Sequence, residues 1–296
     1  MIAAINIIGA GKLGKTLAHL WHQQQVFSVQ HVLCQTKVSA SNAGGFIGLS
    51  PAAMTDCLGI HDTAQLKPAQ LWLIATPDSA MTTTVAQLIQ QQSFNEGDIV
   101  FHCSGALSSD VLAQAKSCGA HIASVHPIHS FACPEKSLTD FNGSYCAYEG
   151  DELALKQLIP AFERIGAQLL PVNAEQKTRY HAASVIACNY LVALLDSSLK
   201  LFVDSGIEQA KAQAILRPIV HQTVDNVLLS SATQALTGPI SRGDSDTVAS
   251  QIEALQDTPQ IADVYKALGK IALNIAREQQ QLSHNKINTL DQLLNK

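Results

Sequence analysis

Three closely spaced glycines near the start of the chain, in the pattern G-x-G-x-x-G, constrain its fold more than any other feature. This glycine run follows an apolar stretch at residues 3–8 and opens a segment with helical character at about 12–24. In such a strand–turn–helix unit, the first glycine permits a tight turn, the second lets the backbone approach a pyrophosphate, and the third lets helix and strand pack closely. The positive end of the helix would face the phosphates. The pattern predicts a dinucleotide site at Gly9, Ala10, Gly11, Lys12, Leu13 and Gly14.

The order of apolar and helical segments extends this prediction over the whole chain. Apolar runs predict strands at 3–8, 29–35, 71–75, 98–103, 121–125, 144–148 and 168–171, with helices at 12–24, 78–92, 108–118 and 151–165. Strands that alternate with helices are typical of a doubly wound parallel sheet. Beyond residue 173 only helices are expected, and the first of them is apolar nearly all round and therefore expected to be buried. We predict an α/β Rossmann-like dinucleotide-binding domain over 1–172, followed by an all-α domain over 173–296.

The end of the second predicted strand indicates which dinucleotide is bound. Sites that prefer NAD(H) carry an acidic residue there, which holds the ribose hydroxyls. This chain has Gln35, Thr36 and Lys37 at that place, so no carboxylate repels a 2′-phosphate and two side chains can donate to it. We therefore expect NADP(H) in preference to NAD(H). Thr76 and Pro77 end the next central strand, on the ligand edge of an open α/β sheet.

Four polar residues are candidates for the chemistry. Ser104 and His126 follow two neighbouring predicted strands at the same edge, near the expected position of a nicotinamide ring. Hydride transfer requires a group that gives or takes a proton, and a histidine suits that task. His181 and Asn189 share a face of the apolar helix at a spacing of two turns, where polar groups need partners or a cavity. A purely structural role is the alternative for each of them.

A turn-rich loop at residues 237–244 surrounds one arginine. Arg242 could hold a substrate carboxylate or phosphate through a bidentate contact. Contact with the cofactor of a partner subunit, or a plain surface position, are the alternatives. We expect no metal, because His126 and His129 have no matching carboxylate or cysteine cluster.

Composition excludes several other classes of protein. The net charge is −5 and no basic run occurs, which argues against a nucleic-acid partner. The 7 cysteines are scattered and never form a C-x-x-C pair, so a reducing, cytoplasmic setting is expected. No uninterrupted apolar run reaches the roughly 18 residues of a membrane span, so no membrane is expected.

The combination of these motifs resembles a bacterial family of NADP oxidoreductases with a Rossmann-like first half and a helical C-terminal domain of unknown function. The resemblance rests on the glycine run and on ATPD at 75–78, HCSGAL at 102–107, HPIHSF at 126–131, HAASVIACNY at 181–190 and TGPISRGD at 237–244. It covers nearly the whole chain. It implies the fold and the cofactor more than the substrate.

A more distant resemblance links the chain to pyrroline-5-carboxylate reductase, ketopantoate reductase, the β-hydroxyacid dehydrogenases (including 6-phosphogluconate dehydrogenase) and prephenate dehydrogenase. It implies a homodimer built by the helical domain, with substrate in the cleft between domains. His126-Pro127 is similar to the catalytic H-P motif of prephenate dehydrogenases, and Ser104 stands where those enzymes have an active-site serine. Where related enzymes carry a catalytic Lys and then Asn on the central helix, this chain has His181 and Val185, and Asn189 matches a later position. This departure argues against a lysine-based mechanism.

The sequence thus favours an NADP(H)-dependent oxidoreductase that transfers hydride to or from a small C=O or C=N substrate. In this hypothesis His126 or His181 handles the proton, Ser104 and Asn189 orient the polar group, and Arg242 holds an anionic tail. One alternative is a non-catalytic NADP-binding sensor or scaffold, because a Rossmann domain alone does not imply turnover. Another is an enzyme similar to prephenate dehydrogenase.

Overall fold

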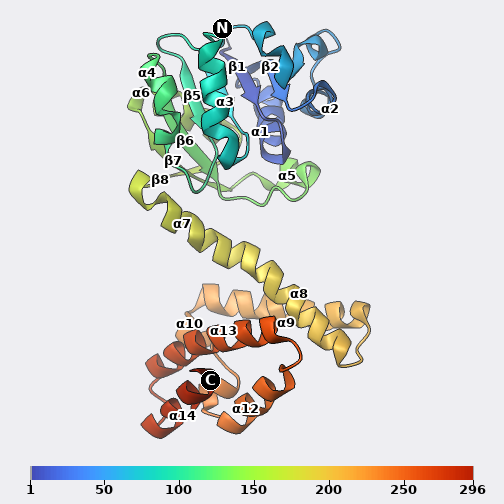
Figure 1. Ribbon diagram of the computed structural model, residues 1–296, viewed down its shortest axis with the longest axis vertical. Coiled ribbons are helices and arrows are strands. Elements are labelled where there is room, and N and C mark those ends of the chain that lie inside the picture. Colours follow the sequence, from blue (N-terminus) through green and yellow to red (C-terminus); the bar gives the residue numbers. More distant parts are fainter. Residues whose placement is uncertain (1, 296) are drawn as a thin grey trace. The chain divides into compact units, whose positions relative to one another are not determined.

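A single eight-stranded sheet organises the first part of the chain (Figure 1), and its order is β3-β2-β1-β4-β5-β6-β7-β8. The computed structural model describes residues 2–295. The strand order reverses between β1 and β4, which makes the carboxyl ends of these two strands a topological switch point, the usual ligand position in such sheets. The strands are β1 (Ala4–Ile8), β2 (Ser28–Cys34), β3 (Cys57–Gly59), β4 (Leu71–Ile74), β5 (Ile99–His102), β6 (His121–Pro127), β7 (Tyr145–Gly150) and β8 (Gln168–Pro171).

Helices cover both faces of this sheet, as expected of a doubly wound fold. On one face, α1 (Lys12–Gln23), α2 (Lys37–Ile47) and α6 (Glu152–Arg164) bury a core in which Trp21 meets Phe162 edge to face at 5.2 Å. On the other face, α3 (Asp78–Gln90) and α4 (Ala113–Ser117) pack over Trp72. A short helix, α5 (Pro134–Asp140), packs near α1. Strands buried on both faces explain the apolar runs of the sequence.

The structure confirms all seven predicted strands and adds β3, whose three residues are too few to show a pattern. The expectation of a wholly parallel sheet is wrong at one pair, because β7 runs antiparallel to β6. The connection between them begins and ends at the same end of the strands, since Pro127 at the end of β6 pairs with Cys146 near the start of β7. Such a connection needs no crossover, so nothing forces the strands to be parallel.

The remainder of the chain is helical, and residues 172–295 contain no strand. Packing divides the molecule into two compact units, one ending at Asn189 and the other beginning at Tyr190. The predicted boundary at 172/173 marks the change of secondary structure, whereas the packing boundary lies within the long helix after it. The helices are α7 (Lys177–Ser184), α8 (Tyr190–Asp204), α9 (Gln209–Leu229), α10 (Ala232–Ala235), α11 (Pro239–Arg242), α12 (Ser245–Ala254), α13 (Pro259–Glu278) and α14 (His284–Asn295).

A π-helical turn, Val185–Asn189, joins α7 to α8 into one continuous helix, Ala174–Asp204. The prediction that its apolar stretch is buried is wrong, because no residue from 182 to 195 is buried in either unit. By length and composition this one helix could also cross a membrane, although the core helices of soluble proteins pass the same test. The predicted homodimer stays a prediction.

Candidate functional site

The glycine run forms a tight turn between β1 and α1. Gly9 has a φ of +90°, and a Cβ added there would lie 2.7 Å from the carbonyl carbon of Ala75 on the neighbouring chain segment. A Cβ on Gly14 would lie 2.4 Å from the carbonyl oxygen of Gly9. Gly11 differs, because a Cβ there would meet nothing within 4 Å. Two glycines therefore permit close packing, and the third leaves open space for a ligand.

The start of α1 is electrostatically suited to an anion. No side chain caps this helix, and its first turn contains no acidic residue. Its first N–H groups have no partner within the helix and carry the positive end of the helix dipole. Thr76, across the same space, has a buried hydroxyl oxygen with no hydrogen-bond partner among residues 2–295. These features fit the pyrophosphate and ribose of a dinucleotide.

A cavity of about 620 Å³ lies in front of this turn, at the switch point of the sheet. Most of the predicted cofactor residues line it: Gly9, Ala10, Gly11, Lys12, Leu13, Gly14, Gln35, Thr76, Pro77 and Ser104. Further lining residues that the sequence did not single out include Cys34, Ser39, Asp78, Met81 and Cys103. The sequence motifs thus converge on one cavity within the first unit.

Two predicted cofactor residues, Thr36 and Lys37, do not line the cavity. The hydroxyl of Thr36 caps α2, because it accepts the backbone N–H of Ser39 at 3.1 Å. Lys37 begins the helix and is exposed. Ser39, one turn into α2, instead presents its side chain on the cavity wall. The end of β2 therefore offers hydroxyl groups and a helix N-terminus. The carboxylate among the lining residues, Asp78, lies at the start of α3 and not at the end of β2.

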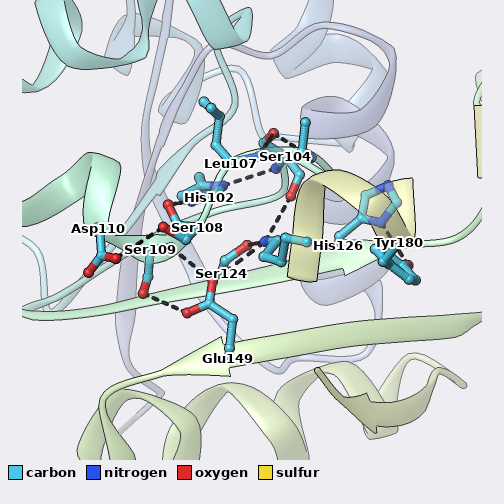
Figure 2. A network of polar contacts seen from close by, with 12 residues as sticks. His102, Ser104, Leu107, Ser108, Ser109, Asp110, Ser124, His126, Glu149 and Tyr180 are labelled. Carbon is cyan, nitrogen blue, oxygen red and sulfur yellow. Dashed lines mark hydrogen bonds and ion pairs between the residues drawn. The ribbon is translucent and has the colours of Figure 1, made fainter. Parts of the chain in front are cut away.

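Ser104 begins a loop that its own side chain holds in shape. Its hydroxyl donates to Asp78 at 2.8 Å and accepts the backbone N–H groups of Ala106 and Leu107. His102, at the end of β5, accepts the N–H of Ser104 through Nδ1 and contacts the carbonyl of Ser108 through Nε2 (Figure 2). Burial lowers the pKa of His102 to about 3. His102 is therefore neutral and holds this loop in place through both ring nitrogens.

The structure brings His126 and His181 together. Their rings meet edge to face, with centroids 5.4 Å apart, and Nδ1 of His126 lies 3.0 Å from the hydroxyl of Tyr180. A Cβ on Gly105 would lie 2.3 Å from Nδ1 of His181 and 2.8 Å from Nε2 of His126. Only a glycine leaves room for both imidazoles at this point. In the described part of the chain, the buried Nδ1 of His181 has no hydrogen-bond partner.

Burial and neighbouring positive charge keep His126 neutral at physiological pH. Burial, the nearby His181 and the nearby Lys177 together lower the pKa of His126 to about 4. Burial raises the pKa of Tyr180 to about 12. At neutral pH, His126 is therefore an uncharged imidazole beside a protonated phenol.

Beneath the histidine pair lies a lysine that sequence reasoning missed. Lys177 is 0% exposed, and its ammonium group donates to the carbonyl of Ser104 at 3.1 Å and to the hydroxyl of Ser124. Glu149, on β7, lies 3.5 Å from it. The available signal was helical spacing, since Lys177, Tyr180 and His181 fall at i, i+3 and i+4 and so share one helix face.

Asn189 does not join this group, and Arg242 belongs to the other unit. Asn189 lies exposed in the π turn, and the extra residue of such a turn rotates the rest of the helix by about 100° relative to a regular α-helix. This rotation breaks the spacing that placed Asn189 on the face of His181. Arg242 belongs to the helical unit, where it lines a second cavity of about 590 Å³ with Thr237 and Ser241.

Potential metal ligands do not cluster at the site. Within residues 2–295, no group of three or more His, Cys, Asp or Glu side chains is placed to hold a metal ion. Both ring nitrogens of His129 are engaged by serine hydroxyls, those of Ser144 and Ser137. His129 therefore anchors the chain after β6.

We expect the stability of the first unit to fall as the pH is lowered from about 6.5 towards 4. His102 and His126 have folded-state pKa values of about 3 and about 4, below the ordinary value of 6.5. In that window the unfolded chain therefore binds more protons, and each extra proton contributes a slope of about 1.4 kcal/mol per pH unit. Urea unfolding at several pH values, followed by the fluorescence of Trp21 and Trp72, measures this slope for the unit that contains both tryptophans.

The His126→Gln variant provides the control, because it lacks one of the two titrations. Its unfolding free energy should depend less steeply on pH than that of the wild-type protein. Equal slopes would contradict the assignment of a depressed pKa to His126.

Comparisons with known proteins place these features in context. Residues 2–127 match the model of a Rossmann-like domain, and residues 144–272 match a model described as a domain of unknown function, DUF2520. No curated protein matches the sequence. Solved structures do match it over nearly its whole length.

Three of these structures illustrate the likeness. A protein of Bacteroides fragilis described as a "putative NADP oxidoreductase" is 20% identical, with a TM-score of 0.75 over 92% of this chain and 98% of that chain. A Thermotoga maritima protein is 25% identical, with a TM-score of 0.67 over 94% and 100%. An imine reductase of a Pseudomonas species is 15% identical, with a TM-score of 0.63 over 99% and 100%. The chain therefore has a Rossmann-like domain, followed by a segment that matches the DUF2520 model and continues from the last two strands of the sheet into the helical part.

Proposed function

We propose that the protein is an NADP(H)-dependent oxidoreductase that acts on a small molecule with a C=O or C=N group. One observation carries the proposal. Ser104 lines the cavity at the switch point of the sheet, and the next residue, Gly105, lies against the imidazoles of His126 and His181. The wall of the cavity that would hold the cofactor and the pair of histidines that could carry a proton therefore meet at two consecutive residues, Ser104 and Gly105. The likeness to solved oxidoreductases supports the same interpretation.

The cradle residues bind and orient the dinucleotide in this proposal. The open side of Gly11 and the uncapped start of α1 would receive the pyrophosphate, and the free hydroxyl of Thr76 would bond a ribose or an amide. When bound, the nicotinamide supplies or accepts the hydride. Asp78 accepts a hydrogen bond from Ser104 and so fixes the loop that lies between the cofactor cavity and the histidine pair.

His126 moves the proton. Because Tyr180 keeps its own proton, its hydroxyl donates to Nδ1 of His126, and Nε2 then carries the ring hydrogen on the side of Gly105. In reduction, this N–H donates to the carbonyl oxygen or imine nitrogen of the substrate. As Nε2 gives up its proton, Nδ1 takes the proton of the Tyr180 hydroxyl, so the imidazole stays neutral and the Tyr180 oxygen regains a proton from solvent. In the reverse direction the two transfers run backwards, and Nε2 accepts the substrate proton as Nδ1 returns its own to Tyr180. His181, whose Nδ1 has no partner within residues 2–295, shares the recognition of the polar group.

NADP(H) is the preferred cofactor in this proposal. The cavity wall beside β2 carries Gln35 and Ser39, and the first turn of α2 contains no acidic residue. A 2′-phosphate gains hydrogen bonds and a favourable helix dipole there, whereas an acidic residue would repel it. Thr36, which caps the helix, keeps this N-terminus in place.

Titration of the purified protein with NADPH and with NADH at equal ionic strength tests the proposal. We expect NADPH to bind at least tenfold more tightly, about 1.4 kcal/mol. A Ser39→Asp variant should reduce or invert this preference, because a carboxylate would then face the 2′-phosphate. A Ser117→Asp variant, at an exposed position on α4, is the charge-matched control.

Binding of neither dinucleotide would refute the proposal. Tight NADPH binding without hydride exchange towards any panel of aldehydes, ketones, imines, prephenate or hydroxyacids would instead favour the non-catalytic sensor.

A further inference from the structure

Three segments distant in sequence meet at one buried charge beneath the histidine pair. Lys177 lies in the first turn of α7, Ser124 and Glu149 lie opposite each other on β6 and β7, and Ser104 follows β5. The ammonium of Lys177 contacts all three residues, and it is 0% exposed. Figure 2 shows three residues of this group, Ser104, Ser124 and Glu149, lying close together beside His126.

A buried ammonium is costly unless its contacts compensate for the lost hydration. Here Glu149 supplies the opposite charge at 3.5 Å, and the carbonyl of Ser104 and the hydroxyl of Ser124 accept two hydrogen bonds. Glu149 is itself held by Ser109, whose backbone N–H and hydroxyl donate at 2.8 and 2.7 Å. The network leaves the ammonium one well-defined position.

We propose that Lys177 is a positioning residue of the oxidoreductase site, which ties α7 to the sheet edge so that Tyr180 and His181 are held against the ring of His126. The proposal rests on the function proposed above. Lys177 itself reaches neither the cavity nor the open side of the imidazoles, because its ammonium is enclosed by Ser104, Ser124 and Glu149. It therefore acts through Tyr180 and His181 on the same helix face.

The charge of Lys177 adds an electrostatic effect to this positioning. The titratable groups near His126 include Tyr180, His181 and Lys177 on α7 and His102 at the end of β5. Glu149 on β7 lies beside Lys177, and the thiols of Cys103 and Cys146 lie near Lys177 and Tyr180 respectively. Burial is the main cause of the lowered pKa of His126 and of His102, and the nearby ammonium of Lys177 adds to both shifts, after His181 in the case of His126. Removing the lysine should therefore raise the pKa of His126 as well as loosen the helix that carries Tyr180.

The test is an NMR titration of the ring protons of His126 as a function of pH, in the protein without cofactor. Lys177→Met leaves the carboxylate of Glu149 buried without its counter-charge and is at risk of misfolding, so the main variant is the double Lys177→Met/Glu149→Gln. We expect the pKa of His126 to rise in this variant. We also expect kcat to fall about ten- to a hundredfold, while the NADPH dissociation constant changes less than about twofold.

Two controls separate the alternatives. Lys156→Met/Glu152→Gln removes an exposed ion pair of the same composition from α6 and should change none of these readouts. Glu149→Gln alone retains the ammonium and should not raise the pKa of His126. An unchanged titration of His126 in a folded double variant would overturn the proposal. If the wild-type protein turns over no substrate, the NMR titration still decides the role of Lys177 independently.

Discussion

Replacing His126 with glutamine lowers kcat/KM by a factor of about 10² to 10⁴, the usual contribution of a positioned acid–base group. Glutamine fills a similar volume and can still contact Tyr180, but it cannot give up a proton at the place where Nε2 faces Gly105. The dissociation constant for NADPH should stay within about twofold, because the cofactor cradle lies on other residues. Steady-state kinetics together with a binding titration separate the two effects.

Two comparison variants make this result specific. His129→Gln changes another histidine after β6, one whose ring nitrogens are both engaged by serines, and it should leave kcat nearly unaltered. Tyr180→Phe removes the partner of Nδ1 and should produce a smaller loss than His126→Gln. A rate in His126→Gln equal to that of the wild-type protein would remove His126 from the mechanism.

Replacing Gly11 with aspartate weakens NADPH binding by at least a hundredfold, or about 2.7 kcal/mol. A Cβ at this position meets no atom within 4 Å, so the fold accommodates the side chain. The new carboxylate, however, occupies the open side of the turn and faces the expected pyrophosphate. Like charges at short range in a partly buried site repel strongly. Calorimetry measures the lost affinity, and circular dichroism checks the fold.

Gly45→Asp is the matched control. Gly45 lies exposed on α2, and a Cβ there also meets nothing within 4 Å. It adds the same side chain and charge away from the cavity, so NADPH affinity should stay within about threefold. Retention of wild-type affinity by Gly11→Asp would mean that the phosphates bind elsewhere, and the proposed cradle would be wrong.

The sequence predicted the sheet well because its signals are local. Strands buried on both faces give continuous apolar runs, and the glycine run has a meaning that depends only on its neighbours. The direction of β7 was not predictable in this way. Whether a connection crosses over or returns depends on how α5 packs, and that is a property of the tertiary fold.

The site was harder to predict than the fold. His126 and His181 could be found because they are histidines near expected ligand edges. Lys177 was missed because a lysine is ordinarily a surface residue, and only the placement of Glu149 opposite Ser124 makes its burial possible. The prediction that Asn189 shares a helix face with His181 was wrong because no local sequence pattern indicated the π turn between them.

The antiparallel direction of β7 decides where this chain tolerates a change of length. Extra residues in the bend at 130–133 lengthen the connection between β6 and β7 and leave the pairing of these two strands intact. One extra residue within β7, ahead of Glu149, would turn that carboxylate to the opposite face of the sheet. The ammonium of Lys177 would then be buried without its counter-charge. An insertion in the bend and an insertion of equal size in the following strand thus differ completely in outcome, which makes the bend, and not the strand, the place for a tag or a tethered probe.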